Sequence, residues 1–221
     1  MDPRRYRGDP VVGVTLYVEG GGDSKVLRTA CRKGFSDFLS KAGVTNRPRI
    51  VASGSRRQAF DDFCAALGKG DRAALLLVDS EEAVASESPW DHLAQRAGDN
   101  WPKPDRATDA QCHLMVQCME TWLLADRETV AAYFGRGFRA TALPHPSRHI
   151  EAIGKAELYR SLANATHGCR TKARYGKGEH SFELLSRIDP GRVMAASPWA
   201  RCFVTAVKAV MGGQGQTVPR P

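Results

Sequence analysis

Four carboxylates lie at or just beyond the ends of apolar runs. Glu19 follows VVGVTLYV, Asp79 and Glu81 follow AALLLV, and Glu120 follows HLMVQCM. A carboxylate just past a buried strand lies at the carboxyl edge of a parallel sheet, where α/β proteins place their ligands. Carboxylate oxygens suit hard cations, so we expect these four residues to form a site for Mg²⁺ or Mn²⁺.

Structural roles compete with this interpretation. Asp79 could cap a helix, with Glu81 and Glu82 in its first turn complementing the helix dipole. Glu120 could face solvent or pair with an arginine. Glu19 is different, because a carboxylate between a buried strand and three glycines contributes little to a core and favours a functional role.

Alternating apolar runs and helical patterns predict an α/β fold with a mainly parallel sheet flanked by helices. Expected strands cover residues 11–18, 48–53, 73–78 and 113–117, and expected helices in the first part begin after Asp23 or Ser24, at Arg56 and at Pro89. Shorter helical stretches are expected at 120–125, 127–134, 149–163, 179–187 and 198–211, with another helix starting at Pro190. We therefore expect a core at 10–138, a helical, basic C-terminal extension at 139–211 packed on the same domain, and a disordered tail at 212–221.

Composition narrows the class of protein. With 42% hydrophobic residues in 221, the chain can bury a substantial core. No apolar stretch of about 18 residues and no signal-peptide pattern occurs, so we expect a cytoplasmic protein without a membrane partner. The six cysteines include no CxxC pair, which argues against a structural zinc site or a disulfide framework.

The net charge of +8 comes entirely from the C-terminal part. Residues 1–138 carry 19 basic and 19 acidic side chains, whereas residues 139–221 carry 13 basic and 5 acidic ones. A neutral part with an acidic cluster followed by a basic part is typical of an enzyme that acts on a polyanion. A solvated basic surface remains the alternative.

Several residues could contact phosphates or a nucleic acid. Gly20 and Gly21 would let the backbone approach a ligand closely. Arg56 and Arg57, at a helix start, could contact phosphates at the same edge of the sheet. The segment TKARYGKGEHS adds Lys172, Arg174 and Lys177 for phosphates, Tyr175 for base stacking and His180 for proton transfer. A surface histidine at a helix start is the alternative for His180.

The acid at the first strand end, the following glycine turn and the acid-x-acid pair Asp79-Ser80-Glu81 resemble the TOPRIM fold of topoisomerases, primases and OLD-type nucleases. The second acid of the pair is glutamate where that family usually has aspartate, which lengthens one ligand arm. The resemblance implies that Glu19 acts as a metal ligand or as a general acid or base.

The chain is also similar to a group of small stand-alone TOPRIM-like proteins, domain-of-unknown-function family 4276. The motifs that carry this similarity are YVEGGGDSK, GSRRQAFDDF, LLLVDSE, MVQCMETWLLAD and YGKGEHSFELLSRIDPGRVMAASPWA. The similarity implies a TOPRIM-like sheet and adds weight to Glu120 and Lys177. Related proteins occur beside ATPases in phage-defence systems.

The sequence therefore predicts a divalent-metal-dependent TOPRIM-type nuclease or phosphodiester-processing protein, in a phage-defence or mobile-element system. Glu19, Lys177 and His180 are the expected catalytic residues, and nucleic acid and an ATPase are the expected partners. Two alternatives stay open: a non-catalytic TOPRIM-like interaction module that partners an ATPase or nucleic acid, and a metal-dependent phosphatase or nucleotide hydrolase.

Overall fold

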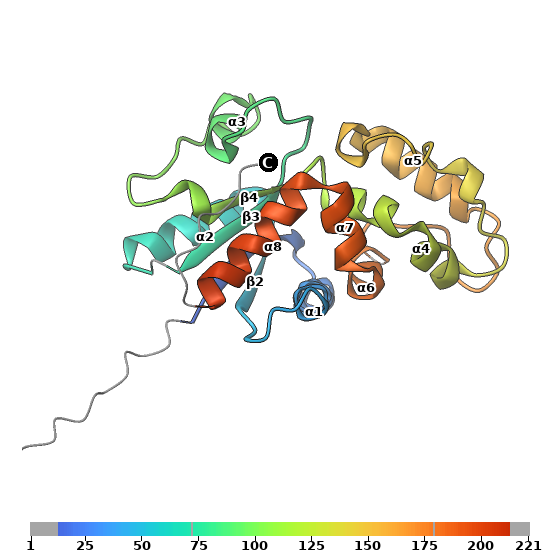
Figure 1. The fold of residues 1–221 in the computed structure, drawn as a ribbon, viewed down its shortest axis with the longest axis horizontal. Coiled ribbons are helices and arrows are strands. Elements are labelled where there is room, and N and C mark those ends of the chain that lie inside the picture. Colours follow the sequence, from blue (N-terminus) through green and yellow to red (C-terminus); the bar gives the residue numbers. More distant parts are fainter. Residues whose placement is uncertain (1–12, 72, 179, 213–221) are drawn as a thin grey trace, which may run out of the picture.

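A four-stranded, all-parallel sheet forms the centre of the protein (Figure 1). The structure is a computed structural model, and it describes residues 13–71, 73–178 and 180–212. The strands are β1 (Thr15–Gly21), β2 (Arg49–Gly54), β3 (Ala74–Asp79) and β4 (Cys112–Met115), in the spatial order β2-β1-β3-β4. The α/β prediction is confirmed.

Helices flank the sheet and follow its strands in the chain. In the first part they are α1 (Lys25–Lys41), α2 (Arg56–Gly68), α3 (Pro89–Gln95) and the 3₁₀ helix η1 (Asp109–Gln111). After β4 come η2 (Met119–Asp126), α4 (Arg127–Phe134), η3 (Ala140–Ala142), η4 (Ile150–Ala152), α5 (Lys155–Thr166), α6 (Ser181–Arg187), α7 (Pro190–Ala196) and α8 (Pro198–Met211).

Both faces of the sheet are covered, as the apolar sequence of the central strand β3 requires. Alternate residues of a strand point to opposite faces. Leu75 and Leu77 accordingly pack in one core with α1 and α8, whereas Leu76 and Val78 pack in a second core with α2 and α3. This three-layer arrangement leaves the carboxyl ends of the strands as the edge at which loops converge.

The C-terminal helices share the larger core with the sheet. Helix α6 packs on α1, and α8 packs on β4. Trp122 of η2 stacks between Phe38 of α1 and Phe203 of α8, with ring centroids 5.2 and 6.3 Å away. Helices α4 to α7 lie together to one side of the sheet (Figure 1). Helices α5 and α6 also contact η2, so the basic C-terminal part packs against the segment that carries Glu120.

Some boundaries differ from those expected. The first strand was expected at 11–18, of which residues 11 and 12 lie outside the described residues. Strand β1 begins at Thr15 and continues to Gly21, so Glu19 lies within the strand rather than after it. The helix expected at 149–163 begins at Lys155, after the short turn η4, because Ile153 and Gly154 have extended backbone angles that separate the two. Ser24, one of the two expected caps, accepts a hydrogen bond from Leu27 N. The tail expected from 212 onward lies outside the described residues except for Gly212.

The structure also bears on two expectations, one on the cysteines and one on membrane-spanning helices. All six cysteines are free thiols, and four of them are buried. Across residues 13–71, 73–178 and 180–212, none of the helices has the length and apolar character needed to span a bilayer.

A glycine at the contact of α1 with α6 provides a test of this packing. Alanine normally stabilises a helix interior by about 0.5–1 kcal/mol relative to glycine. A Cβ at Gly34 would lie 2.7 Å from the Phe182 carbonyl oxygen, however. We expect Gly34→Ala to lower the free energy of unfolding by about 1–3 kcal/mol, because α6 must shift.

Urea denaturation checks this, with Gly68→Ala at the end of α2 as the matched control. A Cβ there meets nothing within 4 Å. Equal stability of the two variants would contradict the α1–α6 contact.

Candidate metal centre

Glu19 and Asp79 meet at the carboxyl edge of the sheet, because β1 and β3 are neighbours. Glu19 Oε2 accepts a hydrogen bond of 3.0 Å from the backbone N–H of Asp79. Asp79 Oδ1 accepts one of 2.9 Å from Met119 N, at the start of η2. Asp79 therefore joins β1, β3 and the segment that follows β4. The alternative of a helix N-cap at Asp79 is wrong, since the next helix begins only at Pro89.

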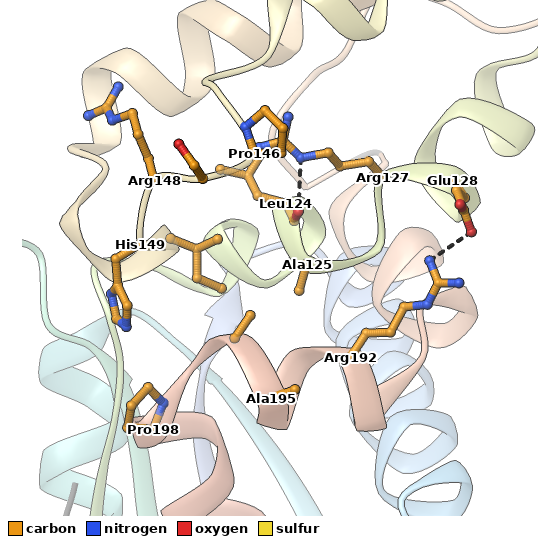
Figure 2. A pocket seen from close by; sticks show the side chains of 13 residues that line it. Leu124, Ala125, Arg127, Glu128, Pro146, Arg148, His149, Arg192, Ala195 and Pro198 are labelled. Atoms are coloured by element: carbon orange, nitrogen blue, oxygen red, sulfur yellow. Dashed lines mark hydrogen bonds and ion pairs between the residues drawn. The ribbon is translucent and has the colours of Figure 1, made fainter.

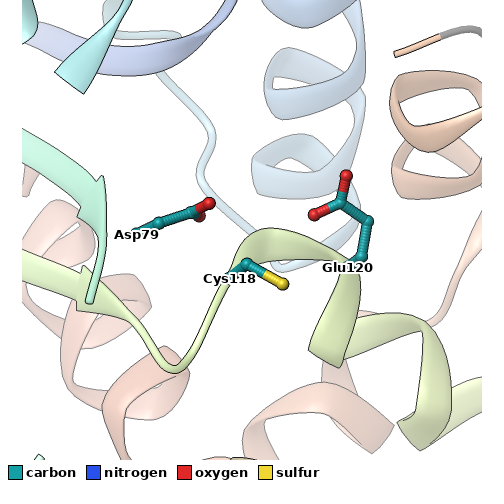
Figure 3. Close-up of side chains that lie close together, drawn as sticks. All are labelled: Asp79, Cys118 and Glu120. Carbon is teal, nitrogen blue, oxygen red and sulfur yellow. The ribbon is translucent and has the colours of Figure 1, made fainter. Parts of the chain in front are cut away.

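The four predicted carboxylates form two overlapping groups that share Asp79. Ligand atoms of Glu19, Asp79 and Glu81 lie within 4.8 Å of one another, and so do those of Asp79, Cys118 and Glu120. Figure 3 shows the carboxylates of Asp79 and Glu120 facing one another, one from the end of β3 and the other from η2. The four predicted acids thus fall into two neighbouring groups rather than one set of four ligands.

Crowding and burial change the acidity of two of these groups. Burial and the nearby charge of Asp79 raise the pKa of Glu19 to about 8. Burial and the charge of Glu120 raise the pKa of Asp79 to about 6, although Lys155 and Lys177 act in the opposite direction. Without a further cation, Glu19 therefore holds a proton at neutral pH.

Lys155, the first residue of α5, supplies the internal counter-charge. Its Nζ lies 2.8 Å from Glu81 Oε1 and 3.3 Å from Asp79 Oδ2. Burial opposes the ionised form of Glu81, but the hydrogen bond and charge of Lys155 outweigh it, so the pKa of Glu81 is lowered. Glu81 adopts a left-handed φ of 70°, a conformation that costs a non-glycine residue about 1 kcal/mol or more. Its N–H donates to Gln117 O at 2.9 Å, which holds it there.

Glu120 is held by hydroxyl groups from the C-terminal helices. It is 2% exposed, and it accepts hydrogen bonds of 2.9 Å from Tyr159 and 3.0 Å from Ser181. The Tyr175 and Ser181 hydroxyls share a further bond of 2.9 Å. Burial and the charge of Glu120 raise the pKa of Tyr159, so its hydroxyl remains a donor. Both carboxylate oxygens of Glu120 are therefore already bound by protein groups.

The two groups differ in how well they suit a hard cation. Glu19, Asp79 and Glu81 offer only oxygens, as Mg²⁺ and Mn²⁺ prefer. Burial and the charge of Glu120 raise the pKa of the Cys118 thiol, and a protonated thiol is a poor ligand. The oxygen set is thus the fitting one, with Glu120 beside it.

A small cavity lies over this edge. It measures about 230 Å³ and is bordered by Glu19, the glycine turn, Glu120 and Lys177. Gly21 needs a positive φ of 85°, and a Cβ there would lie 2.7 Å from the Arg28 backbone. Within the described chain, no carboxylate lies in ion-pair distance of the exposed Lys177 ammonium, which is 5.4 Å from the Tyr159 ring centroid. The cavity thus combines acids at its floor with a cation at its mouth.

A protein-family model covers the part of the chain that forms this site. The family model of a domain of unknown function, DUF4276, matches residues 18–208. The chain belongs to the DUF4276 family. Neither the curated proteins nor the solved structures contain a match to it. The DUF4276 match begins at Val18, just before Glu19, and includes every acid of the site.

The two arginines at the start of α2 in this DUF4276 chain do not reach the cavity. The Arg56 guanidinium donates to Asp79 O and pairs with Asp99, and its side chain is 11% exposed. Arg57 is exposed and pairs with Asp61 one turn along α2. Arg56 therefore supports the strand end from within, which corrects its predicted role as a phosphate contact.

The basic segment 172–180 is divided between surface and core. Lys172 lies 4.5 Å from the Tyr133 ring centroid, and Arg174 is exposed and donates to Ala163 O. The Tyr175 ring is buried, so it offers no face for a base, contrary to the prediction. His180 is 3% exposed, and its Nδ1 accepts from Gly176 N at 3.1 Å. Neither the predicted proton transfer nor a surface histidine fits that position. Among the residues predicted to be functional in this segment, Lys177 borders the cavity, next to Gly178.

Sequence reasoning missed the residues that balance and orient the acids. Lys155, Tyr159 and Ser181 come from α5 and α6, far along the chain from their partners. Lys155 and Tyr159 are four residues apart on one helix face, which is the signal that could have found them. Nothing in the local sequence distinguishes Ser181 from a helix-start serine.

The raised pKa of Glu19 predicts a pH-dependent stability of the metal-free protein. Because the folded state holds a proton that the unfolded state releases near pH 4.5, stability falls as pH rises from about 4.5 to about 8. We expect Glu19→Gln to flatten this fall and to be more stable than the wild type at pH 8. Urea denaturation in EDTA between pH 4.5 and 8.5 measures it.

The exposed Glu87→Gln variant is the control and should follow the wild-type curve. A Glu19→Gln curve parallel to the wild type would contradict the protonated Glu19.

Replacement of Lys155 tests whether its ammonium neutralises Asp79 and Glu81. In metal-free buffer, Lys155→Met leaves Asp79 and Glu81 without their counter-charge, so we expect a loss of about 1–3 kcal/mol in the free energy of unfolding. Added Mn²⁺ should then raise the melting temperature more than it does for the wild type. Denaturation in EDTA and melting with and without Mn²⁺ measure both effects.

Lys33→Met is the matched control, because Lys33 pairs with Asp37 at an exposed position of α1. It should change stability by less than about 1 kcal/mol. An unchanged response to Mn²⁺ in Lys155→Met would show that the ammonium and the metal do not share these carboxylates.

Proposed function

We propose that this protein is a divalent-metal-dependent phosphodiester-processing enzyme, a nuclease of the TOPRIM type. The observation that carries the proposal is the convergence of Glu19, Asp79 and Glu81, whose oxygens lie within 4.8 Å of one another at the carboxyl edge of a parallel sheet. An oxygen-only set of this kind suits Mg²⁺ or Mn²⁺.

Glu19, Asp79 and Glu81 would hold the cation, and Glu120 would stand beside them. A bound divalent cation supplies positive charge that offsets a phosphodiester and makes water a stronger acid. Groups of the protein itself orient the carboxylate ligands. Backbone N–H donors fix one oxygen of Glu19 and one of Asp79, so each presents its carboxylate in a defined orientation.

The raised pKa of Glu19 also suits a general acid or base. A pKa of about 8 lets it hold a proton at neutral pH in the metal-free state and release it when a cation enters. Because Oε2 is bound to Asp79 N, the proton or the ligand belongs on Oε1.

The substrate would meet a basic surface. Lys177 borders the cavity at its mouth and is exposed, so it is placed to contact a phosphate. Residues 139–221 carry 13 basic and 5 acidic side chains, which favours a polyanion such as a nucleic acid. The proposed setting is phage defence or a mobile element with an ATPase as partner. Its support is the similarity of the motifs to the small stand-alone TOPRIM-like group, relatives of which occur beside ATPases in phage-defence systems.

One observation favours a second candidate, a non-catalytic interaction module. The Lys155 ammonium already contacts both Asp79 and Glu81, so the acids have an internal counter-ion without any metal. In such a module the acidic edge would be a structural ion-pair network. The responses of Lys155→Met to Mn²⁺ separate the two candidates.

Nuclease activity is the decisive measurement. Labelled single- and double-stranded DNA and RNA are incubated with the protein in Mg²⁺, Mn²⁺ or EDTA. We expect cleavage with metal only, reduced at least about 100-fold in Glu19→Gln and Asp79→Asn because each loses a ligand or a proton-transfer group.

Glu82→Gln, an exposed neighbour of Glu81, should retain wild-type cleavage. Cleavage in EDTA, or full cleavage by Asp79→Asn, would contradict the proposed centre. Salt-sensitive binding without cleavage in any metal would favour the interaction module.

A further inference from the structure

A second, larger cavity lies away from the acids, between η2, α4, the segment 146–150 and α7. Its volume is about 540 Å³. Figure 2 shows Arg127, Arg148, His149 and Arg192 arranged around it. Glu128 is its one acidic lining residue within the described chain. Of the three arginines, Arg148 pairs with Glu157 and Arg192 pairs with Asp126 and Glu128, so among the described residues Arg127 is the one left without an ion pair.

Arg127 is the cation without a counter-ion here. It is half-buried, and its Nε donates to Leu124 O at 3.2 Å. Burial alone lowers the pKa of Arg127, and among the described residues no carboxylate offsets that burial. A guanidinium stays charged at neutral pH even so. In Figure 2 the side chain extends from α4 toward Pro146, over the cavity.

Nearby acids are occupied by other partners. Asp126 accepts bonds from Thr129 N and Asp189 N and pairs with Arg192. Arg192 also pairs with Glu128. An anion bound beside the half-buried Arg127 would therefore supply a charge partner that no described residue provides.

The rest of the lining is largely apolar. Leu124 and Ile150 are buried beneath it, and Ala195 and Pro198 form its other side. Pockets for small ligands have volumes of about 300–1,000 Å³ and combine apolar walls with a few polar groups that orient the ligand. A ligand that fits carries one strongly anionic end and an apolar or flat body.

We propose that this cavity binds a phosphate monoester with such a body, of the mononucleotide class. Arg127 contacts the phosphate, whereas Arg148, already paired with Glu157, and His149 lie at the exposed rim. The base lies against the Leu124–Ile150 side. This site is separate from the metal centre, and it does not depend on the function proposed above.

The site is placed to affect the acidic edge. Leu124 lies on η2, the 3₁₀ helix that begins next to Glu120, and Ile150 lies five residues before Lys155. A ligand that packs against both would contact the two segments that supply Glu120 and Lys155. This connection follows from the positions of Leu124 and Ile150 in the chain, and the binding experiment below does not depend on it.

Calorimetric titration with AMP in EDTA tests the site without engaging the metal centre. We expect AMP to bind the wild type, and adenosine and inorganic phosphate each to bind more weakly. Arg127→Gln should weaken AMP binding about tenfold or more, since a charge-assisted contact is lost. Arg32→Gln, at an exposed position of α1, is the matched control and should bind as the wild type does.

Ala195→Trp is a second variant that fills the cavity from an exposed position of α7, so it should fold and lose AMP binding. Circular dichroism melting confirms folding of each variant. The proposal is overturned if AMP does not bind the wild type, or if both Arg127→Gln and Ala195→Trp bind it as tightly. Phosphate that binds as tightly as AMP would overturn the role of the apolar side.

Discussion

The structure depends on one electrostatic constraint, which is the crowding of acidic groups at a buried strand edge. Like charges a few ångströms apart in a low dielectric cannot all ionise without compensation. The protein answers with a proton on Glu19, an ammonium from Lys155, and backbone N–H donors to Glu19 and Asp79. A stable core alone does not require such a cluster, because apolar residues would fill the same space at no electrostatic cost.

The parallel sheet and the C-terminal helices contribute different parts of this arrangement. Neighbouring parallel strands bring Glu19 and Asp79 together from positions 60 residues apart. Helices α5 and α6 then supply Lys155, Tyr159 and Ser181, which neutralise or orient the acids. The basic extension is therefore part of the acidic site as well as of the surface around it. Contacts of α5 and α6 with η2, and of α6 with α1, bring it to that edge.

Sequence reasoning succeeded for elements and for acids, and it failed for several basic and aromatic residues. Hydrophobic periodicity located each strand to within a few residues, because burial on both faces leaves a continuous apolar run. It misassigned Arg56, Tyr175 and His180, which face inward. Charged and aromatic residues in a predicted loop are expected to be exposed. Their burial follows only from their packing partners, which are Asp99 for Arg56, Ser181 for Tyr175 and Phe134 for His180.

The sequence by itself determined the α/β class, the position of Glu19 and Asp79 at one edge of the sheet, and the basic character of the C-terminal part. These follow from local pattern and composition, since strand ends carry their side chains to a common edge in any parallel sheet. Only the tertiary structure decided which cations balance the acids, where Lys177 lies, and that Arg127 borders a separate cavity. Those facts depend on contacts between residues distant in the chain, which no local pattern encodes.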